Sequence, residues 1–162
     1  MVFPILVLVL SVVGLVSLKR GAIFVPTNRT AVAEMIEPLN IKVGDRAVDL
    51  GSGDGRVVIA LARAGAEAHG YEHNPLLVWW SRYKIRKAGL SGRAFIHQAN
   101  FWNRDFSGFT VVTVFGINYI MRALEEKLQK EGGRGMRIAS YTFGFPTLKP
   151  LARKNGIYLY KI

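Results

Sequence analysis

One short stretch of the sequence concentrates residues that can hold a ligand. It reads Val48-Asp49-Leu50-Gly51-Ser52-Gly53-Asp54-Gly55-Arg56, an acid followed by three alternating glycines. Arg56 stands where a dinucleotide fingerprint needs its third glycine, and a Walker loop is absent because no Gly-Lys-Ser/Thr is present. Glycines let the backbone turn sharply and approach a ligand without a clash at Cβ. We therefore expect a cofactor loop formed by Asp49, Gly51, Ser52, Gly53, Asp54 and Gly55.

A second acid follows at a distance that suits the same ligand. Glu72 lies 17 residues beyond Gly55, at the end of the next expected strand. A carboxylate at that place grips the ribose hydroxyls of nucleotide-like cofactors. Taken alone, the glycines could form a plain tight turn and Glu72 could be a solvated cap. Their order and spacing together predict a site for a nucleotide-like cofactor.

The elements that position these residues alternate along the chain. Apolar runs predict strands at 46–50, 68–71, 94–98, 110–115 and 136–143, with a possible last strand at 157–162. Helical spacing or composition predicts helices at 29–39, 57–64, 76–88 and 119–130. Strands that alternate with helices imply an α/β, Rossmann-like parallel sheet with helices on both faces. A chain of 162 residues is long enough for about one such domain.

The N-terminus differs from the rest of the chain. Residues 2–18 carry no charge and are mostly Val, Leu, Ile and Phe, which supplies about −4 to −8 kcal/mol for membrane insertion. Lys19 and Arg20 follow directly, so the positive-inside rule places the remainder in the cytoplasm. We expect a single-pass membrane anchor at 1–20 and a cytoplasmic domain at 21–162. A cleaved signal peptide and a buried core helix are the alternatives.

Charge and residue usage narrow the partners. The formal net charge of +11 suggests an anionic neighbour. An anchored domain without an RNA-binding signature favours lipid headgroups over nucleic acid, which we do not expect to be a partner. The absence of cysteine and the spacing of the three histidines predict no metal site. The basic residues that could touch headgroups, or form a solvated helix face, are Arg82, Lys84, Arg86, Lys87 and Arg93.

The glycine motif resembles motif I of class I, seven-strand methyltransferases. The chain is further similar to the small membrane-associated protein-lysine methyltransferases, whose members act on the adenine nucleotide translocase and on the c-ring protein of ATP synthase. The similarity covers most of 22–145. Its most specific parts are Phe24-Val25-Pro26-Thr27, Asp49 to Arg56, and Gly70-Tyr71-Glu72-His73-Asn74-Pro75-Leu76-Leu77-Val78-Trp79-Trp80-Ser81-Arg82-Tyr83. The resemblance implies S-adenosylmethionine as the cofactor and a membrane protein as the substrate.

The resemblance also adds site residues and shows two departures. It places Asn74, Asn100 and Phe101 at the cofactor. Asn100-Phe101-Trp102 stands where the family usually has Asp-Leu-Trp, and an Asn carbonyl can accept from an adenine amino group without a charge. Only 19 residues follow Phe143, so we expect a shortened C-terminal part with reduced sixth and seventh strands.

Methyl transfer to lysine sets demands on the substrate channel. The amine, with a reference pKa near 10.4, must be neutral to attack, and burial lowers its pKa. Aromatic faces also suit a cationic amine or sulfonium. The channel candidates are Phe24, Trp102, Phe115 and Tyr141, with ordinary core packing as the alternative for each. No general base is assigned.

The expected function is therefore S-adenosylmethionine-dependent methylation of a lysine side chain in a membrane protein. Two alternatives stay open. The enzyme could instead methylate a lipid or another small hydrophobic molecule, which is equally compatible with an anchor. It could also be a cofactor-binding module without catalysis of its own, since Asn100 replaces an acid and the C-terminal part is short.

Overall fold

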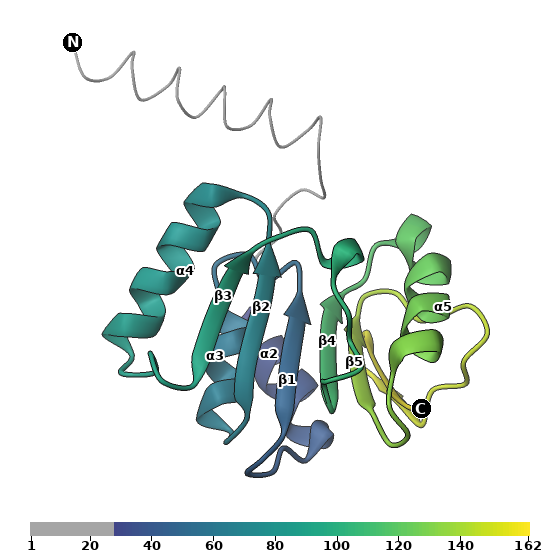
Figure 1. The fold of residues 1–162 in the computed structure, drawn as a ribbon. Coiled ribbons are helices and arrows are strands. Elements are labelled where there is room, and N and C mark those ends of the chain that lie inside the picture. Colours follow the sequence, from purple (N-terminus) through teal and green to yellow (C-terminus); the bar gives the residue numbers. More distant parts are fainter. Residues whose placement is uncertain (1–27) are drawn as a thin grey trace.

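The computed structural model describes residues 28–162 (Figure 1). The expected anchor at 1–20, the channel candidate Phe24 and the segment 24–27 lie outside the described residues. Between residues 28 and 162, no helix has the length and apolar character needed to cross a membrane.

A seven-stranded sheet organises the described residues. Its order is β3-β2-β1-β4-β5-β7-β6. The first five strands are parallel, β7 runs antiparallel to β5, and β6 runs antiparallel to β7. The strands are β1 (Arg46–Leu50), β2 (Glu67–Glu72), β3 (Ala94–Gln98), β4 (Val111–Phe115), β5 (Arg137–Tyr141), β6 (Ala152–Lys154) and β7 (Ile157–Lys161). This arrangement confirms the expected α/β, Rossmann-like fold.

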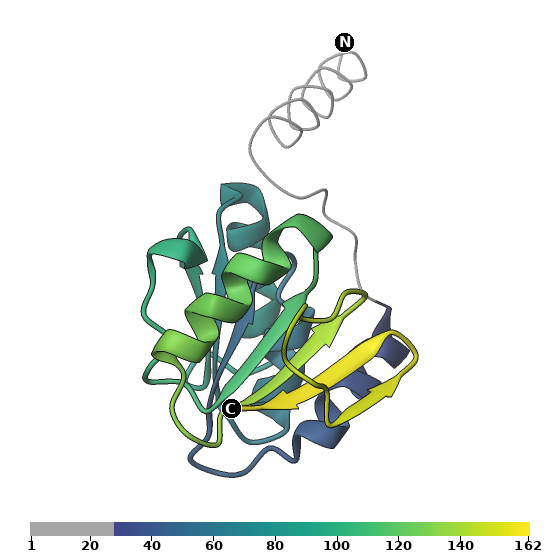
Figure 2. The same ribbon diagram turned by 90° about the vertical axis from the view of Figure 1, so that its right-hand side faces the viewer.

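Helices cover both faces of the sheet. Helices α2 (Arg29–Ile36), α3 (Arg56–Arg63) and α4 (Pro75–Lys87) pack on one face, and α5 (Met121–Glu131) packs on the other (Figures 1 and 2). Short 3-10 turns are η1 (Glu37–Leu39), η2 (Phe101–Asn103) and η3 (Asn118–Ile120). The expected helices are confirmed to within a few residues at their ends.

Alternation along the strands builds two separate core layers. In β1, Ala47 packs with the cluster of α2, α3 and α4, whereas Val48 packs with the cluster of α5. Successive side chains of a strand point to opposite faces, so an apolar run supplies both layers at once. Both side chains are fully buried. The central strands are therefore sandwiched, and only their ends reach solvent.

The C-terminal part differs from the expectation. β7 pairs with all five residues of β5, so it is not reduced, and only β6 is short. The economy lies in the connection 142–151, which contains no helix. Buried Glu125 of α5 holds this connection, because its carboxylate accepts from the amides of Thr147 and Leu148 and from the Thr147 hydroxyl.

Candidate functional site

The glycine loop lies where the order of strands reverses. The chain proceeds from β1 outward to β2 and β3, then returns to add β4 and β5 on the other side of β1. The carboxyl ends of these parallel strands meet at the upper edge in Figure 1. In open α/β sheets, ligands bind at such a switch point. The loop between β1 and α3 therefore has the position of a cofactor site.

The backbone of the loop is tied to the neighbouring strand. Gly51 has φ +77° and Gly53 has φ +51°, values in the left-handed region that favours glycine. The amides of Gly51 and Ser52 both donate to the carbonyl of Tyr71, each at 3.0 Å. These bonds fasten the loop to β2, so its first amides point into the protein and not towards a ligand.

Glu72 is held by three backbone amides. Its Oε2 accepts from Gly53 N at 2.9 Å, and its Oε1 accepts from His73 N and Asn74 N at 2.8 Å each. An ionised carboxylate offers about four lone-pair sites, so these bonds leave room for about one more. Glu72 is therefore a preoriented acceptor at the carboxyl end of β2, in the place expected for a ribose contact.

Asp49 is buried beneath the loop. It accepts from the Thr113 hydroxyl at 2.8 Å, across the pairing of β1 with β4. Burial raises the pKa of Asp49 to about 7, and the negative charges of Glu72 and Asp54 add to the rise. The sequence reasoning missed Thr113. A hydroxyl in the middle of the apolar run Val111–Phe115 was the available signal.

Asp54 is a clamp between the loop and α4. Its carboxylate accepts from Arg56 Nε at 2.9 Å and from Lys84 Nζ at 2.8 Å, and Lys84 also donates to the Asp54 carbonyl at 3.0 Å. Burial alone would raise the pKa of Asp54, but the bonds from Arg56 and Lys84 outweigh it and hold the pKa at about 2. Lys84 belongs to this clamp, so its inclusion in the expected set of headgroup-binding cations was wrong.

The small residues of the loop have different tasks. A Cβ added to Gly70 would lie 2.6 Å from Ser52 Oγ, so the Ser52 side chain packs onto β2. A Cβ added to Gly55 would lie 2.8 Å from Cβ of Ser81 in α4. At Gly51, an added Cβ would meet nothing within 4 Å. Among the described residues, Ser52 Oγ is a buried atom without a hydrogen-bond partner. Gly51 is thus the position where a missing side chain leaves open space for a ligand.

Three further cofactor candidates follow the ends of β2 and β3. Asn74 caps α4, since its carbonyl accepts from Leu76 N at 3.0 Å. Asn100 caps η2 in the same way, accepting from Trp102 N at 3.1 Å, and is exposed. Phe101 is half-buried, with its ring 4.9 Å from the Trp102 ring. All three lie at the edge that carries the glycine loop.

The structure divides the expected aromatic channel. Phe115 and Tyr141 are paired in register at the ends of β4 and β5, with ring centroids 5.5 Å apart in an edge arrangement. Trp102 packs with Phe101 against the α5 layer, whereas Tyr141 packs against the α3 layer. Phe115 and Tyr141 are therefore brought together, and Trp102 lies apart from them.

The charges around the loop suit a cationic ligand. Asp49, Asp54 and Glu72 are close enough for the latter two to raise the pKa of the first. They are three of the eleven acids in a chain of net charge +11. Such a local concentration attracts positive charge, and S-adenosylmethionine carries a sulfonium and an ammonium group. With the open space at Gly51 and the acceptor at Glu72, the residues present fit this cofactor.

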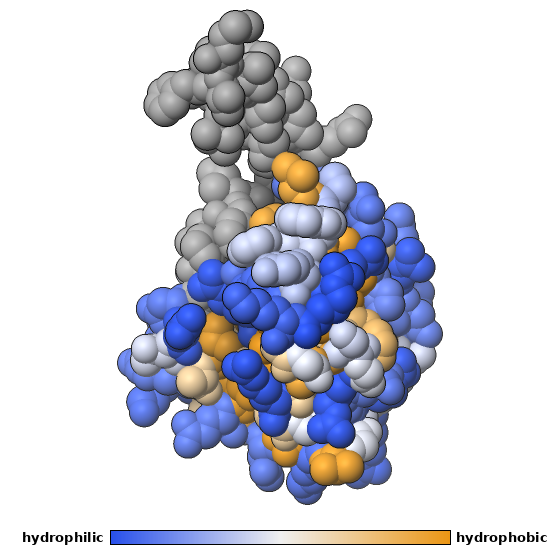
Figure 3. Space-filling model, turned by 90° about the vertical axis from the view of Figure 1, so that its left-hand side faces the viewer, coloured by the Kyte–Doolittle hydropathy of each residue, from blue (hydrophilic) through white to orange (hydrophobic). Residues whose placement is uncertain are grey.

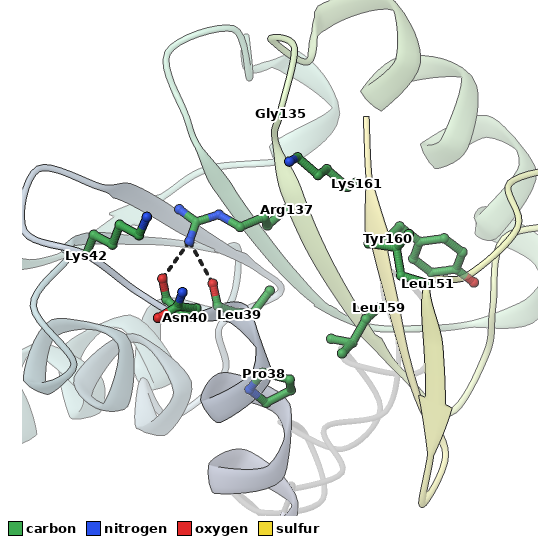
Figure 4. Close-up of a pocket in the computed structure, with 10 residues that line it drawn as sticks. All are labelled: Pro38, Leu39, Asn40, Lys42, Gly135, Arg137, Leu151, Leu159, Tyr160 and Lys161. Atoms are coloured by element: carbon green, nitrogen blue, oxygen red, sulfur yellow. Dashed lines mark hydrogen bonds between the residues drawn. The ribbon is translucent and has the colours of Figure 1, made fainter.

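A hollow of about 520 Å³ lies at the opposite edge of the sheet, at the start of β5 and the end of β7. The Arg137 guanidinium in its wall donates to the carbonyls of Leu39 and Asn40 at 2.7 and 2.8 Å (Figure 4). Asp45 also pairs with Arg137. The side chain with most charge in this hollow is thus used to join β5 to η1, and the hollow is separate from the glycine loop.

Comparison with known sequences identifies the family. Residues 49–152 match the ANTKMT methyltransferase domain. The Mus musculus lysine N-methyltransferase that is named for the c-ring protein of ATP synthase is 41% identical over 127 residues, which is 78% of this chain and 51% of that protein. A protein-lysine N-methyltransferase of Saccharolobus islandicus (strain REY15A) is 37% identical over 149 residues, covering 86% of this chain and 92% of that protein. This chain spans about half the length of the first curated relatives that it matches.

Solved structures support the same relationship. The crystal structure of an RNA methyltransferase from Salinibacter ruber in complex with S-adenosyl-L-homocysteine aligns with a TM-score of 0.81 at 31% identity, covering 85% of this chain and 94% of that chain. A methyltransferase from Thiobacillus denitrificans, also with S-adenosyl-L-homocysteine, shares the fold with a TM-score of 0.62 at 19% identity. The chain therefore belongs to the ANTKMT methyltransferase domain family, with S-adenosylmethionine as its cofactor.

Proposed function

We propose that this protein transfers the methyl group of S-adenosylmethionine to a lysine side chain of a membrane protein. The observation that carries the proposal is the family relationship. Relatives at 41% and 36% identity are named for lysine methylation of the ATP synthase c-ring protein and of the adenine nucleotide translocase. The Saccharolobus protein-lysine methyltransferase, matched over 92% of its length, extends the support to a chain of similar size.

The cofactor half of the site follows from the glycine edge. Glu72 would accept from a ribose hydroxyl with its remaining lone pair. The open side of Gly51 would lie against the cofactor, and the cluster of Asp49, Asp54 and Glu72 would attract its positive charge. The clamp of Asp54 with Lys84 would keep the loop in one conformation during binding.

The substrate half follows from the neighbouring strand ends. Bound S-adenosylmethionine supplies a methyl group on a sulfonium, a good leaving group, so the protein mainly has to orient and desolvate the attacking amine. Phe115 and Tyr141 would form an aromatic wall for the lysine side chain. Their faces suit a cationic amine as it arrives, and burial lowers its pKa, so that the neutral form is available. No general base is part of the proposal.

The membrane enters through the N-terminus. We infer that residues 2–18 form a single-pass anchor and that the domain lies on the cytoplasmic side, because Lys19 and Arg20 follow the uncharged run. An anchor would confine the enzyme to the bilayer and raise its effective concentration near a membrane substrate.

The test is to incubate the full chain and methyl-labelled S-adenosylmethionine with native membranes, then to separate protein, lipid and RNA. We expect label in a protein band, recovered as methylated lysine after hydrolysis. Label in the organic extract would instead support a lipid substrate. Label in RNA would follow the activity named for the Salinibacter relative. Binding of the cofactor without any transfer would indicate a non-catalytic module.

A further inference from the structure

Helix α4 exposes a group of large aromatic side chains. Leu76 is 55% exposed, Trp79 63%, Trp80 45% and Tyr83 41%. We call these four residues the α4 aromatic face. In Figure 3, which views the α4 side of the molecule, pale and orange side chains gather near the top with blue, hydrophilic side chains beside them. An exposed cluster of this kind marks an interaction surface.

The spacing and ring contacts make this face a preformed surface. The four residues follow one another at i, i+3, i+4 and i+7, which places them on one side of a helix. The opposite side, with Val78, Ser81 and Ile85, is buried against the sheet. The rings of Tyr83 and Trp80 lie 5.4 Å apart, and those of Tyr83 and Trp79 lie 6.4 Å apart. The aromatic face is thus ordered by its own contacts.

Two cations extend the same side of the helix. Arg86 and Lys87 lie three and four residues beyond Tyr83, and both are exposed. They differ from Arg82 and Lys84, which are engaged within the protein. Arg82 donates to the Ile96 carbonyl at 2.7 Å, and Lys84 belongs to the Asp54 clamp. The outward side of α4 therefore combines amphipathic rings, one aliphatic side chain and two cations.

We propose that the α4 aromatic face, with Arg86 and Lys87, docks on the interface of an anionic bilayer. Trp and Tyr are the residues that settle at the level of lipid headgroups, and cations beside them are attracted to anionic lipids. The location is informative, because α4 begins only three residues after Glu72. Docking would turn the edge that carries Gly51 and Glu72 towards the membrane. The surface is defined independently of methyl transfer and holds even if the substrate proposal fails.

A bilayer explains this surface better than single-stranded RNA does. Proteins bind RNA bases by stacking them on available aromatic faces. Here the rings of Trp80 and Tyr83 are already stacked on each other, with an interplanar angle of 23°, and those of Trp79 and Tyr83 with an angle of 14°. An exposed Leu76 also matches hydrocarbon and not a base.

The lack of cysteine permits a site-specific test in the full chain. Leu76→Cys carries an environment-sensitive fluorophore next to the three intact rings. Val43→Cys, 89% exposed in the turn before β1, serves as the control at the opposite edge. Each protein is reconstituted into phosphatidylcholine vesicles containing phosphatidylserine and a lipid-borne quencher. Docking predicts a blue shift and strong quenching at position 76, with neither at position 43.

Other outcomes would overturn the proposal. A label at position 76 that the lipid quencher does not reach would show that α4 stays in water. Shielding from aqueous iodide without lipid quenching would show that protein, including the chain's own N-terminal residues, covers the face. A response to single-stranded RNA but not to vesicles would assign the face to nucleic acid. Binding of S-adenosylhomocysteine, measured on the same samples, reports the cofactor site separately.

The charge contribution has its own comparison. Each cation near an anionic membrane contributes about fivefold in affinity. Replacing both Arg86 and Lys87 with Gln, in the Leu76→Cys background, should lower the docked-to-undocked ratio roughly 30-fold on vesicles with phosphatidylserine. Replacing Arg122 and Lys130 of α5, which are also exposed, should leave it unchanged. Equal docking by the two double variants would contradict an electrostatic contact at α4.

Discussion

The Gly53 amide donates to Oε2 of Glu72 at 2.9 Å, and this bond joins the two parts of the cofactor site. Gly53 belongs to the loop after β1, whereas Glu72 ends β2. The carboxylate thus has two tasks, since it holds the glycine loop in place and presents a remaining lone pair at the edge of the sheet. Loop conformation and ribose recognition should therefore be lost together when Glu72 is changed.

Glu72→Ala is expected to weaken binding of S-adenosylhomocysteine by about 10- to 150-fold. A hydrogen bond to a charged group contributes about 1.5–3 kcal/mol, and the substitution also releases Gly53. Calorimetric titration measures the effect. Glu67→Ala is the matched control, because Glu67 begins the same strand and bonds Arg46 and His69 far from the loop. Unchanged affinity in a folded Glu72→Ala protein would mean that the ribose site lies elsewhere.

Lys84→Met should destabilise the loop through Asp54. The substitution removes one of the two cations that neutralise this largely buried carboxylate, and we expect the free energy of unfolding to fall by about 1–3 kcal/mol near pH 7. Lys87→Met, on the exposed side of the same helix, should change it by less than about 0.5 kcal/mol. Urea unfolding measures both variants.

The Lys84 effect should depend on pH in a defined direction. The pKa of Asp54 is lowered from 3.8 to about 2. The stability that its ionised form contributes is therefore present above pH 4 and is lost as the pH falls towards 2. The difference between Lys84→Met and the unsubstituted protein should shrink in that window. A difference that stays constant down to pH 2 would exclude Asp54 as the partner through which Lys84 acts.

Asp49 should make stability fall as the pH rises. Its pKa is raised from 3.8 to about 7, so the folded protein binds a proton that the unfolded chain has released between these values. Its ionisation thus costs stability progressively from pH 4 to pH 7, by up to about 4 kcal/mol. Asp49→Asn, which can still accept from Thr113, should be more stable than the unsubstituted protein at pH 8 and similar to it at pH 4. Thermal unfolding at the two pH values provides the comparison, and parallel pH profiles would refute the assignment.

Deleting residues 1–18 should leave cofactor affinity nearly unchanged, because the glycine loop and Glu72 belong to a domain with its own sheet. Methylation of the natural substrate in membranes should fall sharply, since the proposed anchor supplies proximity. Presenting the target in detergent at high concentration should restore much of the rate. A truncated protein that fails to bind cofactor would argue against a tether, and full activity on membranes would remove the anchor from substrate choice.

Much of the fold and the cofactor edge could be predicted because their signals are local. The strands at 46–50 and 94–98 agree with the structure residue for residue, since each is a short run bounded by polar or turn residues. The glycine loop and Glu72 are separated by one helix and one strand, so their spacing encodes their meeting. β6 was missed because its three residues, Ala152–Lys154, are exposed and mostly charged and carry no apolar alternation.

Contacts between distant residues could not be predicted in the same way. Lys84 reaches Asp54 across 30 positions because α4 packs beside the loop, and on the sequence it looked like part of a surface charge run. Thr113 reaches Asp49 across 64 positions through the register of β1 with β4. Trp102 lies apart from Tyr141 because the two side chains pack on opposite faces of the sheet, which a position at a strand end does not reveal.

The most direct measurement of the central claim is calorimetric titration of two glycine variants with S-adenosylhomocysteine. Gly51→Ala places a methyl group in space where the protein has no atom within 4 Å, at φ +77°. Gly89→Ala does the same at φ +70° after the end of α4 and is the matched control for backbone strain. Both variants should lose a similar amount of stability. If the cofactor lies against the loop, Gly51→Ala loses at least about tenfold in affinity and Gly89→Ala binds like the unsubstituted protein. Equal affinity in all three proteins would contradict the assignment of this edge as the cofactor site.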